Sequence, residues 1–243
     1  DLYLNLDTQH GLGHKMRTWS IAEEWLRRGG TVRWTWDKFP EDMCVTIFDG
    51  YFYTNHDRER WRDAGHLVVT LDDYERSDFS THILVNYNYG ISDKLPCFSA
   101  SRIPGISVQL LGTRYFPLRN DYKKLISIDG DHSFDADSAK REMEPSAFAK
   151  RMAECSCVLT SAGGTVYEVM YLRKPMLLRL ANNTQAVTYH NVINNGLALQ
   201  DSMDTRRMMC HPDIRKKYAE RVSGLVDGQG ATRIVEEIIN VLG

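Results

Sequence analysis

The sequence lacks any long hydrophobic run, and this absence argues against a helix that crosses a membrane. Of its 243 residues 42% are hydrophobic, but the apolar runs, such as 83–85 and 176–178, are far below the roughly 18 residues that a spanning helix needs. The N-terminus also lacks the basic segment followed by an apolar one that marks a secretory leader. The composition therefore predicts a globular protein with no membrane span.

The chain also has little net charge and few cysteines. Its 30 basic and 32 acidic residues leave a formal charge of -2 and are dispersed along the sequence. This balance disfavours, rather than excludes, nucleic acid as a partner. The five cysteines are odd in number and irregular in spacing, which favours free thiols over a disulfide framework and predicts a cytoplasmic protein.

No cluster in the sequence has the spacing of a metal site. The segment Cys155-Ser156-Cys157 does not have the spacing of a zinc knuckle, and we interpret its cysteines as two small core residues that enter a strand. The acidic and imidazole groups of 129–132 are consecutive, and consecutive loop residues seldom converge on one ion. We therefore expect no metal and no other cofactor.

Strand and helix patterns alternate along the first half of the chain. Expected strands are 2–7, 31–36, 44–48, 67–71 and 83–85, and expected helices are 16–28 and 58–64. A strand, a helix and a strand in succession predict parallel strands joined by a right-handed crossover. Several of the apolar runs end in acidic residues, which is typical of the carboxyl edge where open α/β sheets bind ligands.

The alternation breaks at 116–120 and then resumes, which predicts two lobes, 1–118 and 119–243. Expected strands of the second lobe are 125–128, 158–160, 176–180 and 197–200, and expected helices are 138–153, 165–172, 184–194, 212–225 and 231–242. The order predicts an α/β protein with two Rossmann-type lobes whose parallel sheets face a cleft. Only about 30 residues separate Gly130 from Ser161, so this part of the second lobe is short.

A glycine-rich turn precedes the first expected helix. Gly11 and Gly13 flank Leu12, and His14 follows them. Glycines allow a tight turn, and the free N–H groups of a helix start can bind an anion or a sugar. An imidazole at this position can transfer a proton near neutral pH, so His14 is a candidate base. The alternative is a histidine that caps the helix or faces solvent.

A second small-residue turn precedes the expected helix 165–172. It comprises Ser161, Ala162, Gly163, Gly164 and Thr165. Its backbone amides could hold a diphosphate. Glu168, one turn into the helix, could accept hydrogen bonds from both hydroxyls of a ribose. The alternative is a turn that packs tightly, with Glu168 favouring the first turn electrostatically.

Polar residues follow three other expected strands. Asn183, Thr184 and Gln185 offer side chains that donate to and accept from sugar hydroxyls, although an ordinary loop and helix cap would have the same composition. In the first lobe the corresponding residues are Asp49, Tyr51, Asp72 and Asp73. They could bind hydroxyls or orient His14, or simply cap strand ends.

Taken together, these motifs resemble a known family, the nucleotide-sugar hydrolase of the pseudaminic acid pathway, a relative of the GT-B glycosyltransferase that makes lipid II. The most specific match is 11–17, which follows the pattern Gly-x-Gly-His-x-Met-Arg. The other matching segments, in family order, are 47–51, 71–73, 84–88, 111–115, 118–119, 161–168, 174–175, Gln185, 195–196 and 227–231. The chain departs from the family at 129–131, where an added acid replaces a glycine, and at Thr184.

The resemblance implies a GT-B fold with the nucleotide held mainly by the second lobe. It implies that His14 activates water, that Tyr51 lines the sugar pocket, and that the amides of Gly163, Gly164 and Thr165 stabilise the leaving diphosphate. Glu168 would bind the ribose, and Gln185 the sugar or a phosphate. No metal would be needed.

Three functions follow from this reading. The first is metal-independent hydrolysis of a UDP-like nucleotide sugar at the anomeric phosphate bond, with His14 as base and Asp49 and Tyr51 beside it. The alternative is a GT-B glycosyltransferase that moves the sugar to a hydroxyl acceptor, which would be a small molecule, a glycan or a modified nucleic-acid base. A second alternative is a protein that binds nucleotide sugars without turnover. Sequence separates the first two poorly because they share the donor site.

Overall fold

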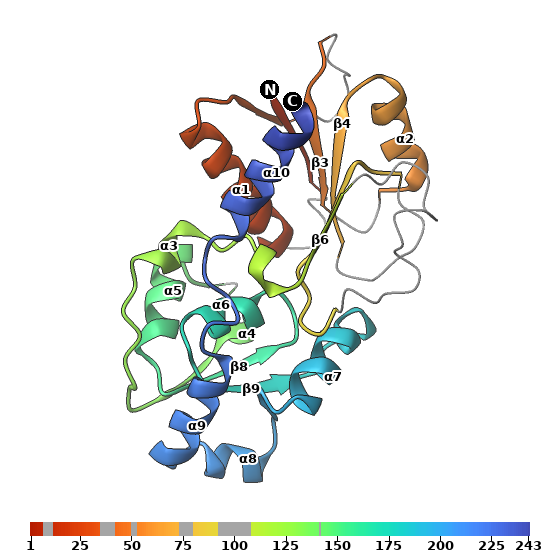
Figure 1. Ribbon diagram of the computed structural model, residues 1–243. Helices are drawn as coiled ribbons and strands as arrows, with labels where there is room; N and C mark the ends of the chain where they lie inside the picture. The colour runs from red at the N-terminus through yellow and green to blue at the C-terminus, as the bar shows by residue number, and fades with distance from the viewer. Residues whose placement is uncertain (7–11, 35–41, 50–52, 73–79, 92–107, 141) are drawn as a thin grey trace. The chain divides into compact units, whose positions relative to one another are not determined.

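The computed structural model describes residues 1–6, 12–34, 42–49, 53–72, 80–91, 108–140 and 142–243 (Figure 1). The chain forms two compact units. Unit 1 comprises Asp1–Pro117 and Gln229–Gly243, and unit 2 comprises Leu118–Gly228. Each unit has its own parallel sheet, as the alternation of strands and helices predicts.

Unit 1 has six strands in its described part, in the order β2-β1-β3-β4-β5-β6, and all the pairs are parallel. The elements are β1 (Leu2–Leu6), α1 (Leu12–Arg27), β2 (Val32–Trp34), β3 (Val45–Asp49), α2 (Asn55–Asp63), β4 (Leu67–Leu71), β5 (Ile83–Asn86), β6 (Val108–Leu111), the 3-10 turn η1 (Thr113–Tyr115) and α10 (Gly230–Leu242). The five strands and two helices expected in the first lobe are confirmed within a few residues, and β6 is an addition.

Alternation along the strands divides the core of unit 1 between two faces of the sheet. In β3, Val45 and Ile47 pack in the cluster that includes residues of α1 and α10, whereas Phe48 packs with Trp61 of α2. Helices thus cover both faces, and for this reason every residue of β3 and β4 is buried. Asp49 falls on the same face as Val45 and Ile47, and its carboxylate therefore points towards α1.

The last helix belongs to unit 1, which corrects the expected division of the chain. Residues 229–243 were assigned to the second lobe with the rest of 119–243, but Ile234, Val235 and Ile238 of α10 join the same core cluster as Ile21 of α1. Figure 1 shows α10, in blue, beside α1, in red. The period of a helix reveals that it has an apolar face but not which sheet that face covers.

Unit 2 has four strands in its described part, in the order β10-β9-β8-β7, again all parallel. The elements are α3 (Asn120–Lys123), β7 (Ser133–Asp135), α4 (Ala136–Ala139), α5 (Pro145–Glu154), β8 (Cys157–Ser161), α6 (Thr165–Tyr171), β9 (Met176–Arg179), the 3-10 turn η2 (Asn183–Gln185), α7 (Ala186–Asn194), β10 (Leu199–Gln200), α8 (Met203–Met208) and α9 (Pro212–Val222). This sheet is smaller than that of unit 1, in keeping with the short second lobe.

Two expected elements of unit 2 are wrong. Residues 125–128 form no strand, and Ile126 is 83% exposed. The edge strand that pairs with β8 is β7, which the sequence pattern does not predict. The single helix expected over 138–153 is instead α4 and α5. Pro145 begins α5 as its first residue, because proline has no N–H to give and suits a helix start far better than its interior.

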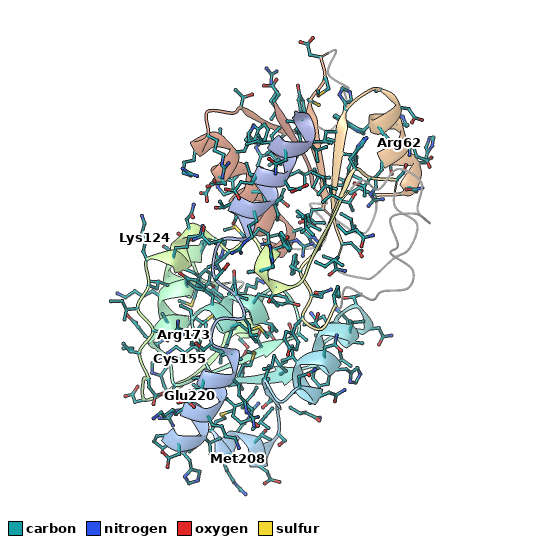
Figure 2. All side chains as sticks on the ribbon, in the orientation of Figure 1. Arg62, Lys124, Cys155, Arg173, Met208 and Glu220 are labelled. Atoms are coloured by element: carbon teal, nitrogen blue, oxygen red, sulfur yellow. The ribbon has the colours of Figure 1, made fainter. Side chains whose placement is uncertain are left out.

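Cys155 and Cys157 enter β8 as core residues, which confirms the expectation from sequence. Both are buried, and Figure 2 labels Cys155 within unit 2. Burial raises the pKa of the Cys155 thiol to about 11 and that of Cys157 to about 12. The ammonium group of Lys174 donates to the carbonyl oxygen of Cys155 over 2.7 Å. No helix in the described part of the chain is long and apolar enough to cross a membrane.

Candidate active site

The candidate acid-base site of unit 1 is built on the carboxyl end of β3. Asp49 is the last residue of that strand and is fully buried. It occupies a position where the alternation of the strand would otherwise place an apolar side chain against α1. A buried carboxylate is costly unless charged or hydrogen-bonded partners surround it, and α1 supplies three such partners.

The first partner is His14, the third residue of α1. Its Nδ1 lies 2.7 Å from Oδ1 of Asp49, and its side chain is almost entirely buried, since the residue is 7% exposed. Of the candidates proposed from sequence, the structure therefore brings His14 and Asp49 together. An imidazole held through one ring nitrogen by a carboxylate presents the other nitrogen in a defined orientation.

The second partner is Arg17, one turn further along α1. Its Nε donates to Oδ2 of Asp49 over 2.6 Å, and its Nη2 donates to Oδ1. The guanidinium thus grips both oxygens of the carboxylate, as its planar fork allows. In the sequence Arg17 belongs to the 11–17 match, but the match does not assign it a role. Its place three residues after His14, on the same helix face, was the available signal.

Thr18 and Tyr87 also contact Asp49 and Arg17. The hydroxyl of Thr18 donates to Oδ2 of Asp49 over 2.8 Å. Nη1 of Arg17 donates to the hydroxyl of Tyr87, which follows β5, and the guanidinium lies 5.4 Å from the ring centroid. Burial by itself would raise the pKa of Asp49, but the charge and hydrogen bonds of Arg17, with those of His14, lower it to about 2. Asp49 is therefore an anion under all ordinary conditions.

Several candidates of the first lobe cannot be placed against this cluster. Gly11, Tyr51 and Asp73 lie outside the described residues. Gly13 lies in the first turn of α1, and a methyl group at its Cα would meet no described atom within 4 Å. Asp72 is fully buried after β4. Leu71 is the residue of β4 that pairs with Asp49, so alternation places Asp72 on the opposite face.

The candidate nucleotide site of unit 2 lies where β8 ends and α6 begins. Ser161 ends β8 and Thr165 begins α6; Ala162 is buried between them, and Gly163 and Gly164 are partly exposed. A Cβ on Gly163 would lie 3.5 Å from Nε2 of Gln185. The structure therefore brings the turn and Gln185 together, although they are more than 20 residues apart in sequence.

Two side chains that sequence analysis missed also reach this turn. The hydroxyl of Ser161 donates to Oδ1 of Asp137 over 3.0 Å. The ammonium group of Lys140 donates to the hydroxyl of Thr165 over 3.3 Å. Asp137 lies in α4, and Lys140 is the residue directly after that helix. The sequence pattern predicts one long helix over 138–153, so it does not indicate the directions of these two side chains.

Glu168 has a partner that the sequence did not suggest. Its Oε1 accepts a hydrogen bond from Nε of Arg119 over 3.0 Å, and both side chains are largely buried. Arg119 also donates to the hydroxyl of Tyr122 over 2.8 Å. Burial, and then the charge of Glu168, raise the pKa of Tyr122 well above its usual value. The ribose role of Glu168 stays a prediction.

Asn183, Thr184 and Gln185 form the turn η2 after β9. Asn182 caps it by accepting a hydrogen bond from the amide of Thr184 over 3.1 Å. Asn183 and Thr184 are exposed, and Gln185 accepts a hydrogen bond from the amide of Ala181 over 3.4 Å. Of these three residues, only Gln185 has a described contact with the turn at Gly163.

A charged network lies along the same edge of the second sheet. Arg179, at the end of β9, donates to Asp135 over 2.9 Å and to Asp201 over 2.8 Å. Arg206 of α8 donates to both oxygens of Asp201. The hydrogen bonds and charges of Arg206 and Arg179 lower the pKa of Asp201 to about 2. No group of three or more metal-binding side chains is found among the described residues.

The chain has two open parallel sheets, each with helices and with polar residues at the carboxyl ends of its strands, and this is the architecture of the GT-B fold. A solved structure of this class, MurG of Acinetobacter baumannii, is similar over 98% of this chain and 99% of its own, with a TM-score of 0.63 and 10% sequence identity. The similarity establishes the expected fold.

A second solved structure, the glycotransferase of kitacinnamycin, aligns with 84% of this chain and 44% of its own at 13% identity, with a TM-score of only 0.33. No protein-family model matches the sequence, and no curated protein sequence matches it. What the chain does must therefore be argued from its own residues.

Proposed function

We propose that this protein is a glycosyltransferase that moves a sugar from a UDP-like nucleotide donor to a hydroxyl group of an acceptor. The observation that carries the proposal is the buried pair of His14 and Asp49, which stands where a parallel sheet of this fold binds ligands. The likeness of the fold to MurG supports transfer over hydrolysis.

In the proposed reaction His14 accepts the proton of the acceptor hydroxyl. The oxygen attacks the anomeric carbon, the bond from that carbon to the donor phosphate breaks, and the nucleoside diphosphate leaves with the bonding electron pair. Attack opposite the leaving group inverts the anomeric configuration. A positioned base of this kind contributes about 10²- to 10⁴-fold to the rate.

In the same proposal, groups of unit 2 bind the nucleotide. The amide of Gly163 donates to the carbonyl oxygen of Ser161 over 2.8 Å, so in this proposal the amides of Gly164 and Thr165 hold the diphosphate. Gln185 contacts the sugar or a phosphate, and Glu168 accepts from the ribose hydroxyls. Arg119 supports this last role, because its hold on Oε1 fixes the direction of the carboxylate. We assign no metal to the reaction. Free thiols at Cys44, Cys155 and Cys157 are in keeping with a cytoplasmic protein.

Hydrolysis would use the same base with water as the nucleophile, and a binding protein would lack turnover altogether. The acceptor decides between these functions. A small molecule and a glycan both suit the proposal. A modified nucleic-acid base suits it less well because the chain has a net charge of -2.

The test is to incubate the protein with UDP-, GDP- and CMP-sugars, with EDTA present, and to follow nucleotide release and sugar transfer by mass spectrometry. The panel is run with water alone and with pooled small-molecule and glycan acceptors. We expect release of the nucleotide only when an acceptor hydroxyl is present. Equal release in water would make the protein a hydrolase, and tight binding without release from any donor would make it a binding protein.

A further inference from the structure

In the buried cluster of His14, Arg17 and Asp49, either ring nitrogen of the imidazole can carry its proton. Nδ1 of His14 lies 2.7 Å from Oδ1 of Asp49 and also 2.7 Å from Nη2 of Arg17. A guanidinium group has donors only, and an ionised carboxylate has acceptors only. Nδ1 must therefore either donate to Asp49 or accept from Arg17.

Electrostatics decides between the two arrangements. If Nδ1 accepted from Arg17, its lone pair would also face Oδ1 of Asp49 at 2.7 Å with no proton between them, which is repulsive. If Nδ1 carries the proton, both Nδ1 and Nη2 donate to Oδ1, which can accept two hydrogen bonds. Arg17 directs Nε and Nη2 at Asp49 in either arrangement, so the short contact between Nδ1 and Oδ1 is the one that distinguishes them.

We propose that Arg17 is the positioning residue of this site: by holding both oxygens of Asp49 it fixes the Nδ1-protonated tautomer of His14 and leaves Nε2 as the nitrogen that accepts a proton. This positioning role of Arg17 rests on the proposed function in one respect, namely that His14 is the base. The guanidinium has a second effect, because it balances the charge of Asp49. A proton taken up by His14 then gives the buried cluster a net positive charge.

The described groups that face the cluster are few. Arg17 and Thr18 come from α1, Asp49 from β3, and Tyr87 from the segment after β5, where its hydroxyl accepts from Arg17. Asp72 lies on the opposite face of the sheet by alternation. Within the cluster itself, His14 contacts one carboxylate and one guanidinium.

The tautomer can be measured without any assay of activity. Two-dimensional ¹H–¹⁵N correlation spectra of the histidine side chains distinguish the protonated from the unprotonated ring nitrogen. The chain has eight histidines, and His14→Gln identifies the signals of His14 by their loss. We expect a protonated Nδ1 and an unprotonated Nε2 at pH 7.5. The opposite pattern would overturn the proposal, whatever the protein turns out to catalyse.

Two variants then separate charge from geometry in the donor assay. Arg17→Met leaves Asp49 without a counter-charge, so the imidazolium form of His14 becomes easier to reach. We expect kcat to fall by at least about 10-fold, the KM for the donor to stay within a few fold, and the acid limb of the kcat/KM profile to move to higher pH. Arg17→Lys keeps the charge but cannot span both oxygens, so it should lower kcat and leave the limb near its wild-type position.

Arg27→Met is the matched control, because Arg27 lies on the same helix, is exposed and pairs with Glu24 at the surface. It should change neither the rate nor the profile. If Arg17→Met lowers the rate equally at every pH, Arg17 serves only to stabilise the fold, and the proposal is wrong. A wild-type protein that turns over no donor would contradict the proposed function, while the tautomer would still test the role of Arg17.

Discussion

The two units place different chemistry at the same edge of their sheets. In unit 1 a carboxylate, an imidazole and a guanidinium are buried and satisfy one another, with Asp49 at 0% exposure. In unit 2 the edge carries hydroxyl and amide groups together with a turn of small residues. Its arginines Arg179 and Arg206 are partly exposed, whereas the pair of Arg119 and Glu168 is largely buried. Buried charges that neutralise one another form a rigid acid-base group, whereas exposed polar groups suit the reversible binding of a nucleotide.

The comparison has a physical basis in the two sheets. The sheet of unit 1 has helices on both faces, so the end of β3 is buried and Asp49 needs partners from α1. In unit 2 only Ser161, Gly163 and Gly164 of the turn between Ser161 and Thr165 are partly exposed, and it is there that we propose a ligand binds. If unit 1 performs the acid-base step and unit 2 binds the nucleotide, substitutions at the edge of unit 1 should lower kcat, and those at the edge of unit 2 should weaken nucleotide binding.

The largest effect should come from His14→Gln. Loss of the proposed base should lower kcat by about 10²- to 10⁴-fold and leave the affinity for the nucleoside diphosphate within a few fold, because the proposal assigns the binding groups to unit 2. Steady-state kinetics and isothermal calorimetry measure the two quantities. His56→Gln, an exposed histidine on α2, is the control. Equal loss of rate and affinity would remove the distinction between the units.

Asp49→Asn should have the next largest effect, on both rate and stability. It leaves the buried charge of Arg17 without a partner, which typically costs about 3–5 kcal/mol of unfolding free energy. Asp49 has a lowered pKa, about 2 in the folded protein against 3.8 when unperturbed. Its contribution to stability is therefore present above pH 4 and is lost as the pH falls towards 2.

Chemical denaturation between pH 7 and pH 2.5 measures this contribution. The wild-type protein should lose more stability than Asp49→Asn over the acid range, so that the two curves converge. Asp63→Asn, at the exposed end of α2, should follow the wild type throughout. Parallel curves for wild type and Asp49→Asn would show that Asp49 is not the charged partner described.

Glu168→Gln tests the ribose role in unit 2. Replacing a charged acceptor with an amide should weaken the binding of UDP by about 10-fold and weaken that of its 2′-deoxy analogue less, with kcat little changed at saturating donor. Calorimetric titration with both nucleotides measures the difference. Glu220→Gln, on the exposed face of α9, is the control. An equal loss for both nucleotides would mean that Glu168 only holds Arg119.

The smallest effect should come from Asp201→Asn. Its partners are the half-exposed Arg206 and the partly buried Arg179, and exposed ion pairs contribute little. We expect the Tm to fall by about 2–4 °C, well below the fall for Asp49→Asn, as measured by differential scanning calorimetry. If Asp201→Asn and Asp49→Asn lowered the Tm equally, burial would not explain the difference between the charged groups of the two units.

Much of the fold could be predicted from the sequence because local patterns determine it. The apolar runs and helical periods of the first lobe indicated β1 to β5 within a few residues, and the order of strands and helices predicted parallel sheets. The weak points were short elements. Ser133–Asp135 is too short for its alternation to be recognised, and the apolar run 125–128 looked like a strand although it is exposed.

The sequence by itself determined the position of His14 at the start of a helix, the acid at the end of β3 and the turn at Gly163 and Gly164, because each follows from the neighbouring residues along the chain. Only the tertiary structure decided which of these residues meet. Arg17 grips Asp49, Arg119 holds Glu168, and α10 returns to the sheet of unit 1. Such contacts join residues from 30 to more than 200 positions apart, and they depend on how amphipathic faces pack, which no local pattern contains.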